Sequence, residues 1–301
     1  MQDPVLVEVT RGGQVESCHA GAFAVVDAQG GVLLSAGDIE RAVFPRSAVK
    51  VIQALPLVES GAADRFGLDD EALALACASH GGEARHVAVA ERMLAAAGQD
   101  ASRLECGAHW PSFPDAARAL ACQGAEPGTL HNNCSGKHAG FICLACGLGE
   151  DPRGYVAPTH RVQREVRAAL EAVTGTTLRE GSHGIDGCSI PTYAIPLRAL
   201  AQGFARIGTG IGLTPGHATA AQRLRRAVAK HPFLVAGTGR FDTIVMEALA
   251  ERAFVKVGAE GVFCAAPPER GLGIAIKCDD GAVRAAEAVL AALLRRLLPL
   301  S

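Results

Sequence analysis

Short apolar segments that favour β-strands lie near both ends of the chain, and this distribution constrains the fold more than any other feature. Three lie near the start, over residues 5–9, 22–27 and 32–35, and three near the end, over residues 253–257, 261–265 and 273–277. Turn residues, including Gln29, Gly30 and Gly31, separate the early segments, which predicts an antiparallel meander. Strands at both ends with helices between them predict one sheet built from both parts of the chain.

Patterns with helical spacing occupy the middle of the chain and its last segment. They predict helices over residues 45–60, 69–78, 84–97, 159–173 and 283–298. From about residue 106 to residue 191, loops rich in glycine and proline interrupt the pattern. We therefore expect an α/β (α+β) fold and a single catalytic domain over 1–301, with a sheet subdomain over 1–45 and 236–301 and a helical, loop-rich lobe over 46–235.

Composition and charge exclude several classes of partner. Hydrophobic residues make up 49% of the chain, enough for a substantial core, and the formal net charge is −2. No basic region points to nucleic acid or to a membrane surface, so the expected partner is a small molecule. The sequence contains no long apolar run and does not start with a secretion signal, which predicts a cytoplasmic protein. Most of the ten cysteines lie in apolar segments, which disfavours a disulfide framework.

Lysine is rare in this chain, with only five lysines among the 29 basic residues. In an arginine-rich chain, lysine is expected to persist where a neutral amine must act as a base or as a ligand. Ser47 and Lys50 form a Ser-x-x-Lys pair near the start of the helix predicted from residue 45. Positions three apart share a helix face, so Lys50 can reach the Ser47 hydroxyl and remove its proton. Taken alone the motif is weak evidence for catalysis, because it also arises by chance.

Two further segments carry side chains suited to the same chemistry. Ser79 and His80 precede a Gly81-Gly82 pair at the end of a predicted helix, where a hydroxyl can approach a ligand closely. The alternative is a helix C-cap with a core histidine. Lys256 stands on an apolar predicted strand, where it either extends to solvent or faces a site. In their order these motifs resemble those of serine β-lactamases and penicillin-binding proteins, although the strand motif lacks its threonine.

Two cysteines differ from the others because they lie in polar, glycine-rich loops. Cys134 belongs to the segment His131-Asn-Asn-Cys-Ser-Gly-Lys-His138, and Cys188 to the segment Asp186-Gly-Cys. Two thiols with nitrogen and oxygen donors nearby could hold zinc, but their spacing matches no standard zinc finger or ribbon. From spacing alone, a metal site and a metal-free loop both stay open.

Four segments together carry a family resemblance. Residues 44–50, 131–141, 186–191 and 256–261 resemble the L-asparaginase II family, the serine-dependent asparaginases with a β-lactamase-like fold. The resemblance runs through almost the whole chain in the same order. It implies an L-asparaginase that hydrolyses L-asparagine to L-aspartate and ammonia, on a serine β-lactamase/penicillin-binding-protein-like fold.

The resemblance also implies roles for individual residues. It implies two catalytic pairs, Ser47/Lys50 and Ser79/Lys256, and a zinc ion held by Cys134, Lys137 and Cys188. It further implies that the α-carboxylate and α-amino groups of the substrate contact Arg46, His138 and Asp186. Arg46 has independent support, because a guanidinium binds a carboxylate in a bidentate manner. His80 and Ala259 are additional candidates for substrate contact.

These assignments predict acyl-enzyme catalysis. Ser47, or alternatively Ser79, would attack the amide carbon while a neutral lysine accepts the proton. The backbone N–H groups of Ser47 and Ala259 would form the oxyanion hole, by analogy with β-lactamases. The alternatives are a glutaminase, another serine acyl hydrolase of this fold, or a catalytically silent metal-binding relative. The apolar C-terminal helix could cover the sheet or a second copy of the chain, and we predict a homodimer.

Overall fold

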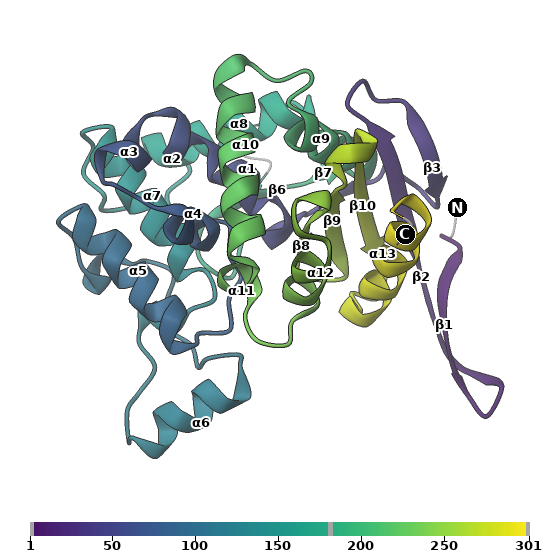
Figure 1. Cartoon of the computed structure of the whole chain (residues 1–301), viewed down its shortest axis with the longest axis horizontal. Coiled ribbons are helices and arrows are strands. Elements are labelled where there is room, and N and C mark those ends of the chain that lie inside the picture. Colours follow the sequence, from purple (N-terminus) through teal and green to yellow (C-terminus); the bar gives the residue numbers. More distant parts are fainter. Residues whose placement is uncertain (1–2, 180–182, 299–301) are drawn as a thin grey trace.

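The computed structural model describes residues 3–179 and 183–298, and a six-stranded antiparallel sheet forms one side of it (Figure 1). Its strands are β1 (Val5–Arg11), β2 (Gln14–Asp27), β3 (Val32–Ala36), β8 (Phe254–Val257), β9 (Val262–Ala266) and β10 (Leu272–Cys278). The order is β1-β2-β10-β9-β8, with β3 also paired to β2. The predicted sheet with strands from both parts of the chain is confirmed.

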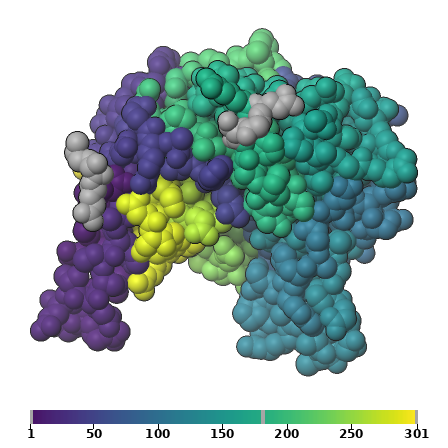
Figure 2. All heavy atoms as spheres, turned by 180° about the vertical axis from the view of Figure 1, so that it is seen from behind, coloured from purple at the N-terminus to yellow at the C-terminus, as the bar shows by residue number. Residues whose placement is uncertain are grey.

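The two halves of the long strand β2 pair with different strands. Its first half, residues 14–20, pairs with β1, whereas residues 21–27 pair with β10 and residues 23–26 also with β3. The hairpin of β1 and the first half of β2 projects from the body, as the front and back views both show (Figures 1 and 2). Its turn is formed by Gly12 and Gly13, which both have positive φ and suit a two-residue hairpin loop.

Helices cover both faces of the central strands. Neighbouring residues of a strand point to opposite faces, yet every residue of β8 and β9 is buried. The covering helices are α9 (Leu197–Thr209) and α13 (Val283–Leu297), which each contact β9 and β10. The buried side of α13 therefore covers the sheet, and the homodimer expected from this helix stays a prediction.

The remaining helices form the lobe that carries most of the candidate site. They are α1 (Lys50–Gln53), α2 (Leu55–Glu59), α3 (Ala62–Arg65), α4 (Asp70–Ala76), α5 (Ala84–Ala96), α6 (Pro114–Cys122), α7 (Ser135–Gly147), α8 (Arg161–Thr174), α10 (Pro215–Lys230), α11 (Pro232–Ala236) and α12 (Phe241–Leu249). Helix α7 is buried on every side from Ser135 to Ala145 and lies at the centre of this lobe. In the part of the chain that the structure describes, no helix is long and apolar enough to span a bilayer.

The single helix predicted over residues 45–60 is divided into three short elements. A 3₁₀ helix, η1 (Arg46–Val49), leads into α1, and α2 begins after a break at Ala54. Pro56 explains the break, because proline has no N–H to donate to the carbonyl of Ile52 and its ring crowds the preceding turn. Independently of Pro56, Ser47 lies on the 3₁₀ turn η1 and Lys50 begins α1, so the two residues do not share one regular α-helix.

Gly273 on β10 allows α9 to approach the sheet closely. A Cβ atom at this position would lie 1.9 Å from the Ala201 carbonyl oxygen and 2.3 Å from the Ala205 nitrogen, both in the backbone of α9. We expect Gly273→Ala to lower the free energy of unfolding by about 1–3 kcal/mol or more, because backbone must move to relieve the overlap. Urea unfolding would measure it. Gly128→Ala is the control, since a Cβ atom there meets nothing within 4 Å, and equal effects of the two substitutions would contradict this account.

Candidate active site

Lys50 lies at the centre of a buried polar cluster, which also contains Ser79 and Cys134. Its Nζ donates hydrogen bonds to Ser79 Oγ (2.9 Å), to Cys134 Sγ (3.1 Å) and to the Ala78 carbonyl oxygen. The side chain is fully buried, and this burial lowers the pKa of Lys50, although the Cys134 thiolate opposes the shift. Three segments far apart in the sequence, the η1–α1 turn, the end of α4 and the start of α7, therefore meet at one amine.

Ser47 lies one turn before Lys50, at the start of η1. Within the described residues no side-chain hydrogen bond joins the Ser47 hydroxyl to the Lys50 amine, whose hydroxyl partner is Ser79. The Lys50 backbone N–H donates to the Ser47 carbonyl oxygen. The backbone N–H groups of Ser47 and Ala259 donate no hydrogen bond to any described residue. The two segments approach closely, because a Cβ atom at Gly258 would lie 2.5 Å from the Pro45 carbonyl oxygen. Two free N–H donors beside a serine are the components of an oxyanion hole.

Lys256 enters the cluster from β8 and is also fully buried. Its Nζ donates to the Val257 carbonyl oxygen (3.0 Å), and no hydrogen bond to Ser79 is present in the described structure. Burial lowers the pKa of Lys256 to about 7, with the Asp242 carboxylate opposing and the Lys50 charge adding to the shift. Lys256 is therefore an amine that loses its proton near neutral pH.

Asp242 is a component of the cluster that the sequence did not reveal. It lies in the first turn of α12 and is 1% exposed. Its Oδ1 accepts a hydrogen bond from the Val257 N–H (2.8 Å), whereas its Oδ2 is buried without a partner. A buried carboxylate with an unsatisfied oxygen is energetically unfavourable unless a neighbouring charge compensates it, and Lys256 supplies that charge while it is protonated.

The two cysteines from the polar loops come together with Lys137. Lys137 Nζ donates to Cys188 Sγ (3.0 Å), and the Cys134 and Cys188 thiols are hydrogen-bonded to each other. Asn132 shapes the loop before α7 by accepting the Cys134 N–H at its side-chain oxygen (2.9 Å). The bond from Cys188 and the nearby lysine charges lower the pKa of Cys134 well below its ordinary value, despite burial.

Arg46 and Asp186 form a charged pair at the edge of the cluster. Arg46 Nε donates to Asp186 Oδ1 (2.7 Å). Burial raises the pKa of Asp186, but Lys137 and Arg46 lower it by more, so this pKa lies below its ordinary value. Three non-glycine residues near this pair have positive φ: Arg46 (51°), Ser189 (74°) and Glu260 (59°). Such strained residues gather at ligand sites, where the surrounding structure holds them in place.

A cavity of about 390 Å³ opens beside this pair. Its lining includes Arg46 and the exposed side chains of Phe44 and Ile185, with Glu260 and Lys277 at the charged side. Pockets of roughly 300–1,000 Å³ are typical for small ligands. The cavity leads from solvent to the Arg46 guanidinium and offers a route for a small molecule.

His80 has the contacts of a core histidine, which was the alternative to a substrate-binding role. The Gly82 N–H donates to His80 Nδ1 (3.1 Å), so the hydrogen is on Nε2, which donates to Ser135 Oγ (3.0 Å). The ring stacks on His86 at 4.7 Å between centroids, and burial lowers its pKa well below the ordinary value. Because both nitrogens have protein partners, His80 positions the segment after Ser79.

His138 has one buried ring nitrogen without a partner. The Glu105 N–H donates to Tyr155 Oη (2.9 Å), which leaves the Tyr155 hydroxyl hydrogen to donate to His138 Nδ1 (2.6 Å). The His138 hydrogen then lies on Nε2, a buried donor with no acceptor among the described residues. Burial and the charges of Lys137 and Lys50 lower the pKa of His138 well below its ordinary value, so the ring is neutral. A neutral donor in this position can bind a carbonyl or carboxylate oxygen.

The sequence profile of the L-asparaginase II family matches residues 7–300. Among the curated proteins, no sequence matches significantly. Many solved structures match, among them two with low scores. One is a β-lactamase from Mycobacterium bovis (TM-score 0.43, 16% identity, 92% of this chain and 94% of that chain), the other simvastatin synthase from Aspergillus terreus (TM-score 0.45, 12% identity, 92% and 93%). Neither likeness extends to function. Because the family profile covers nearly the whole chain and the structure unites the segments that carry the resemblance, this protein belongs to the L-asparaginase II family.

Proposed function

We propose that this amidohydrolase is an L-asparaginase that converts L-asparagine to L-aspartate and ammonia through a Ser47 acyl-enzyme. One observation carries the proposal: the free N–H groups of Ser47 and Ala259 stand beside a serine that lies one turn from the Lys50–Ser79 hydrogen bond. An acyl transfer needs a nucleophile, a proton acceptor and an oxyanion hole, and these residues supply each of them.

The steps follow from this arrangement. Ser47 Oγ attacks the side-chain carbonyl carbon and its proton passes to the Lys50 amine, while the two free N–H groups bind the resulting oxyanion. Ser79, hydrogen-bonded to Lys50, relays the proton to the amide nitrogen, so that the C–N bond breaks and ammonia leaves. Water then attacks the ester, the Ser47 hydroxyl regains a proton, and aspartate is released.

Arg46 and Asp186 are suited to the backbone groups of an amino acid. Their bond places a guanidinium and a carboxylate side by side, and Arg46 lines the cavity of about 390 Å³. The guanidinium can accept the α-carboxylate of the substrate and the carboxylate its α-ammonium. The His138 Nε2–H is a further donor for a substrate oxygen.

Ammonia release from the purified protein tests the proposal. We expect turnover of L-asparagine, measured beside L-glutamine, a D-Ala-D-Ala peptide and nitrocefin. A preference for glutamine or for one of the β-lactam-type substrates would replace asparagine as the substrate. Absence of turnover with every substrate in the presence of zinc would contradict the proposed function and favour a silent metal-binding relative.

The residues implied as zinc ligands fit a zinc ion. Cys134 and Cys188 are buried, and Lys137 Nζ lies 3.0 Å from Cys188 Sγ, which gives two sulfur donors and one nitrogen donor at one point. Histidine, cysteine and acidic side chains alone form no group of three in the described residues, so the proposed third donor is Lys137, which would have to lose its proton and bind as the neutral amine. Bound zinc would supply a fixed positive charge and hold the loop before α7 to the loop of Cys188. The proposed bond cleavage uses the serines and lysines.

We expect the purified protein to contain about one zinc ion per chain, because two buried thiols and the Lys137 amine lie together. Cys188→Ser should lower the zinc content, measured by elemental analysis, and the melting temperature. Cys122→Ser is the matched control because Cys122 is an exposed free cysteine. Chelation that leaves turnover intact would show a structural ion; zinc content that is unchanged in Cys188→Ser would contradict this ligand set.

Asp242→Asn is expected to move the pH profile of activity. The carboxylate raises the pKa of Lys256 against the effect of burial, so its removal should lower that pKa below about 7. If neutral Lys256 is required, the acid limb of kcat/KM then shifts to lower pH. The asparagine can keep the hydrogen bond from the Val257 N–H, which separates charge from geometry. An unchanged acid limb with lower kcat would mean that Asp242 acts only on the fold.

A further inference from the structure

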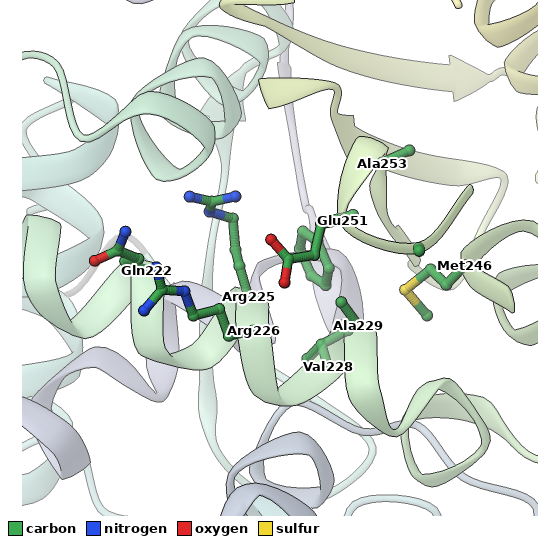
Figure 3. Close-up of a pocket in the computed structure, with 10 residues that line it drawn as sticks. Gln222, Arg225, Arg226, Val228, Ala229, Met246, Glu251 and Ala253 are labelled. Atoms are coloured by element: carbon green, nitrogen blue, oxygen red, sulfur yellow. The ribbon is translucent and has the colours of Figure 1, made fainter. Parts of the chain in front are cut away.

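A small cavity lies between α10 and the turn that follows α12, apart from the cluster of Lys50. Its volume is about 70 Å³, and the residues that matter for its chemistry are Gln222, Arg225, Arg226, Ala250 and Glu251. Gln222, Arg225 and Arg226 share one face of α10, being three and four residues apart. Figure 3 shows these side chains on one side and Glu251 on the other.

Arg225 is a partly buried cation without a close partner. Its Nε is buried and makes no hydrogen bond, and no carboxylate of the described residues lies within 4.0 Å of its guanidinium. Arg223, on the same helix, is instead paired with Asp64 at 2.7 Å. Burial lowers the pKa of Arg225, and Glu251 only partly opposes that shift. A partly buried charge is costly unless a partner compensates it, so the Arg225 guanidinium is suited to bind an anion.

The wall opposite Arg225 has a strained backbone. Ala250 has φ 48° and ψ −128°, a combination that is essentially restricted to glycine, and its N–H is held by the Met246 carbonyl oxygen. The strained turn directs the next residue, Glu251, toward the arginine side of the cavity (Figure 3). Strain of roughly 1–3 kcal/mol persists only where the surroundings impose it, and ligand clamps are one such place.

We propose that this cavity binds a small carboxylate. The two arginines and Glu251 leave one net positive charge, which one carboxylate neutralises, whereas a doubly charged oxoanion would meet repulsion from Glu251. A cavity of about 70 Å³ has room for roughly two to five non-hydrogen atoms. The planar guanidinium of Arg225 matches the two oxygens of a carboxylate, and Glu251 is placed to accept an ammonium group on the same ligand.

Calorimetric titration of the full chain with acetate, glycine and inorganic phosphate tests this site. We expect saturable binding of acetate that is weakened about tenfold or more in Arg225→Met, since hydrogen bonds to charged groups are removed. Arg226→Met provides a second variant if the first is unstable. Arg223→Met is the control on the same helix. Arg46→Met removes the proposed carboxylate contact of the active site and should leave this binding unchanged.

Two comparisons define the ligand and decide the proposal. Tighter binding of glycine than of acetate, lost in Glu251→Gln, would identify an amino-acid ligand, whereas equal binding would identify a simple carboxylate. Equal acetate binding in the wild type and Arg225→Met, no saturable binding at all, or a preference for phosphate would each overturn the proposal. The readout is binding, so its outcome is independent of asparaginase activity.

Discussion

Ser47→Ala is expected to lower kcat/KM for ammonia release from L-asparagine by about 10³-fold or more, since loss of a nucleophile removes the covalent route. The reason is the position of Ser47. Its own N–H donates no hydrogen bond within the described residues, and it lies beside the N–H of Ala259, which is also free. Denaturing mass spectrometry of the wild type during turnover should show an acyl adduct that is absent in the variant.

Ser79→Ala separates the two candidate nucleophiles. In the proposed mechanism Ser79 relays a proton, so its loss should slow turnover but still allow the acyl adduct to form on Ser47. The exposed Ser102 provides a control substitution with alanine. If Ser47→Ala remains active while Ser79→Ala forms no adduct, the hydrogen bond between Lys50 and Ser79 marks the nucleophile, and the roles of the two serines exchange.

Lys256→Met, which removes the lysine of the implied Ser79/Lys256 catalytic pair, is expected to abolish activity and at the same time to stabilise the protein. The pKa of Lys256 is about 7 in the folded chain, against about 10.4 for a lysine in an unfolded chain. One pKa unit corresponds to about 1.4 kcal/mol, so burial of this amine lowers stability at neutral pH by up to about 4 kcal/mol. Methionine has a similar size and no charge, and we expect a gain of roughly 2–4 kcal/mol in the free energy of unfolding at pH 7.

The gain in the free energy of unfolding of Lys256→Met should depend on pH in a defined way. Between the folded and unfolded pKa values the unfolded chain binds a proton that the folded chain has released, so stability of the wild type rises with pH in that window. The advantage of Lys256→Met should therefore be full below pH about 7 and vanish above about 10.4. Urea unfolding at neutral and alkaline pH measures it, with the exposed Lys230→Met as control. A destabilised Lys256→Met at neutral pH would contradict the assignment.

The strands were predictable from sequence because each is a short apolar run between turn residues. Residues 253–257, 261–265 and 273–277 correspond to β8, β9 and β10 within one or two residues. The helix over 45–60 was predicted without allowing for Pro56, whose missing N–H divides it. Local pattern therefore located the elements, and one overlooked proline accounts for the main difference in this region.

The site was only partly predictable, because its contacts join distant segments. Sequence spacing favoured a bond between Ser47 and Lys50, but the amine donates to Ser79, which lies 29 positions away. Asp242 had one signal, an acidic residue at the start of a mostly apolar helix, and its significance depends on the nearby Lys256. The hydrogen position on His138 depends on Tyr155 and cannot be deduced from neighbouring residues.

The pairing of β2 with β10 also determines when the protein can become active during synthesis. Ala24 pairs with Ala275, so the centre of the sheet joins residues from opposite parts of the chain. Such long-range closure gives a high contact order and slow folding, during which apolar surface is exposed to aggregation. A ribosome-bound chain that ends before β8 contains both serines and both loop cysteines, but it lacks Lys256 and β10, the strand that pairs with the second half of β2. The order of synthesis thus delays assembly of the site until the last strands have emerged.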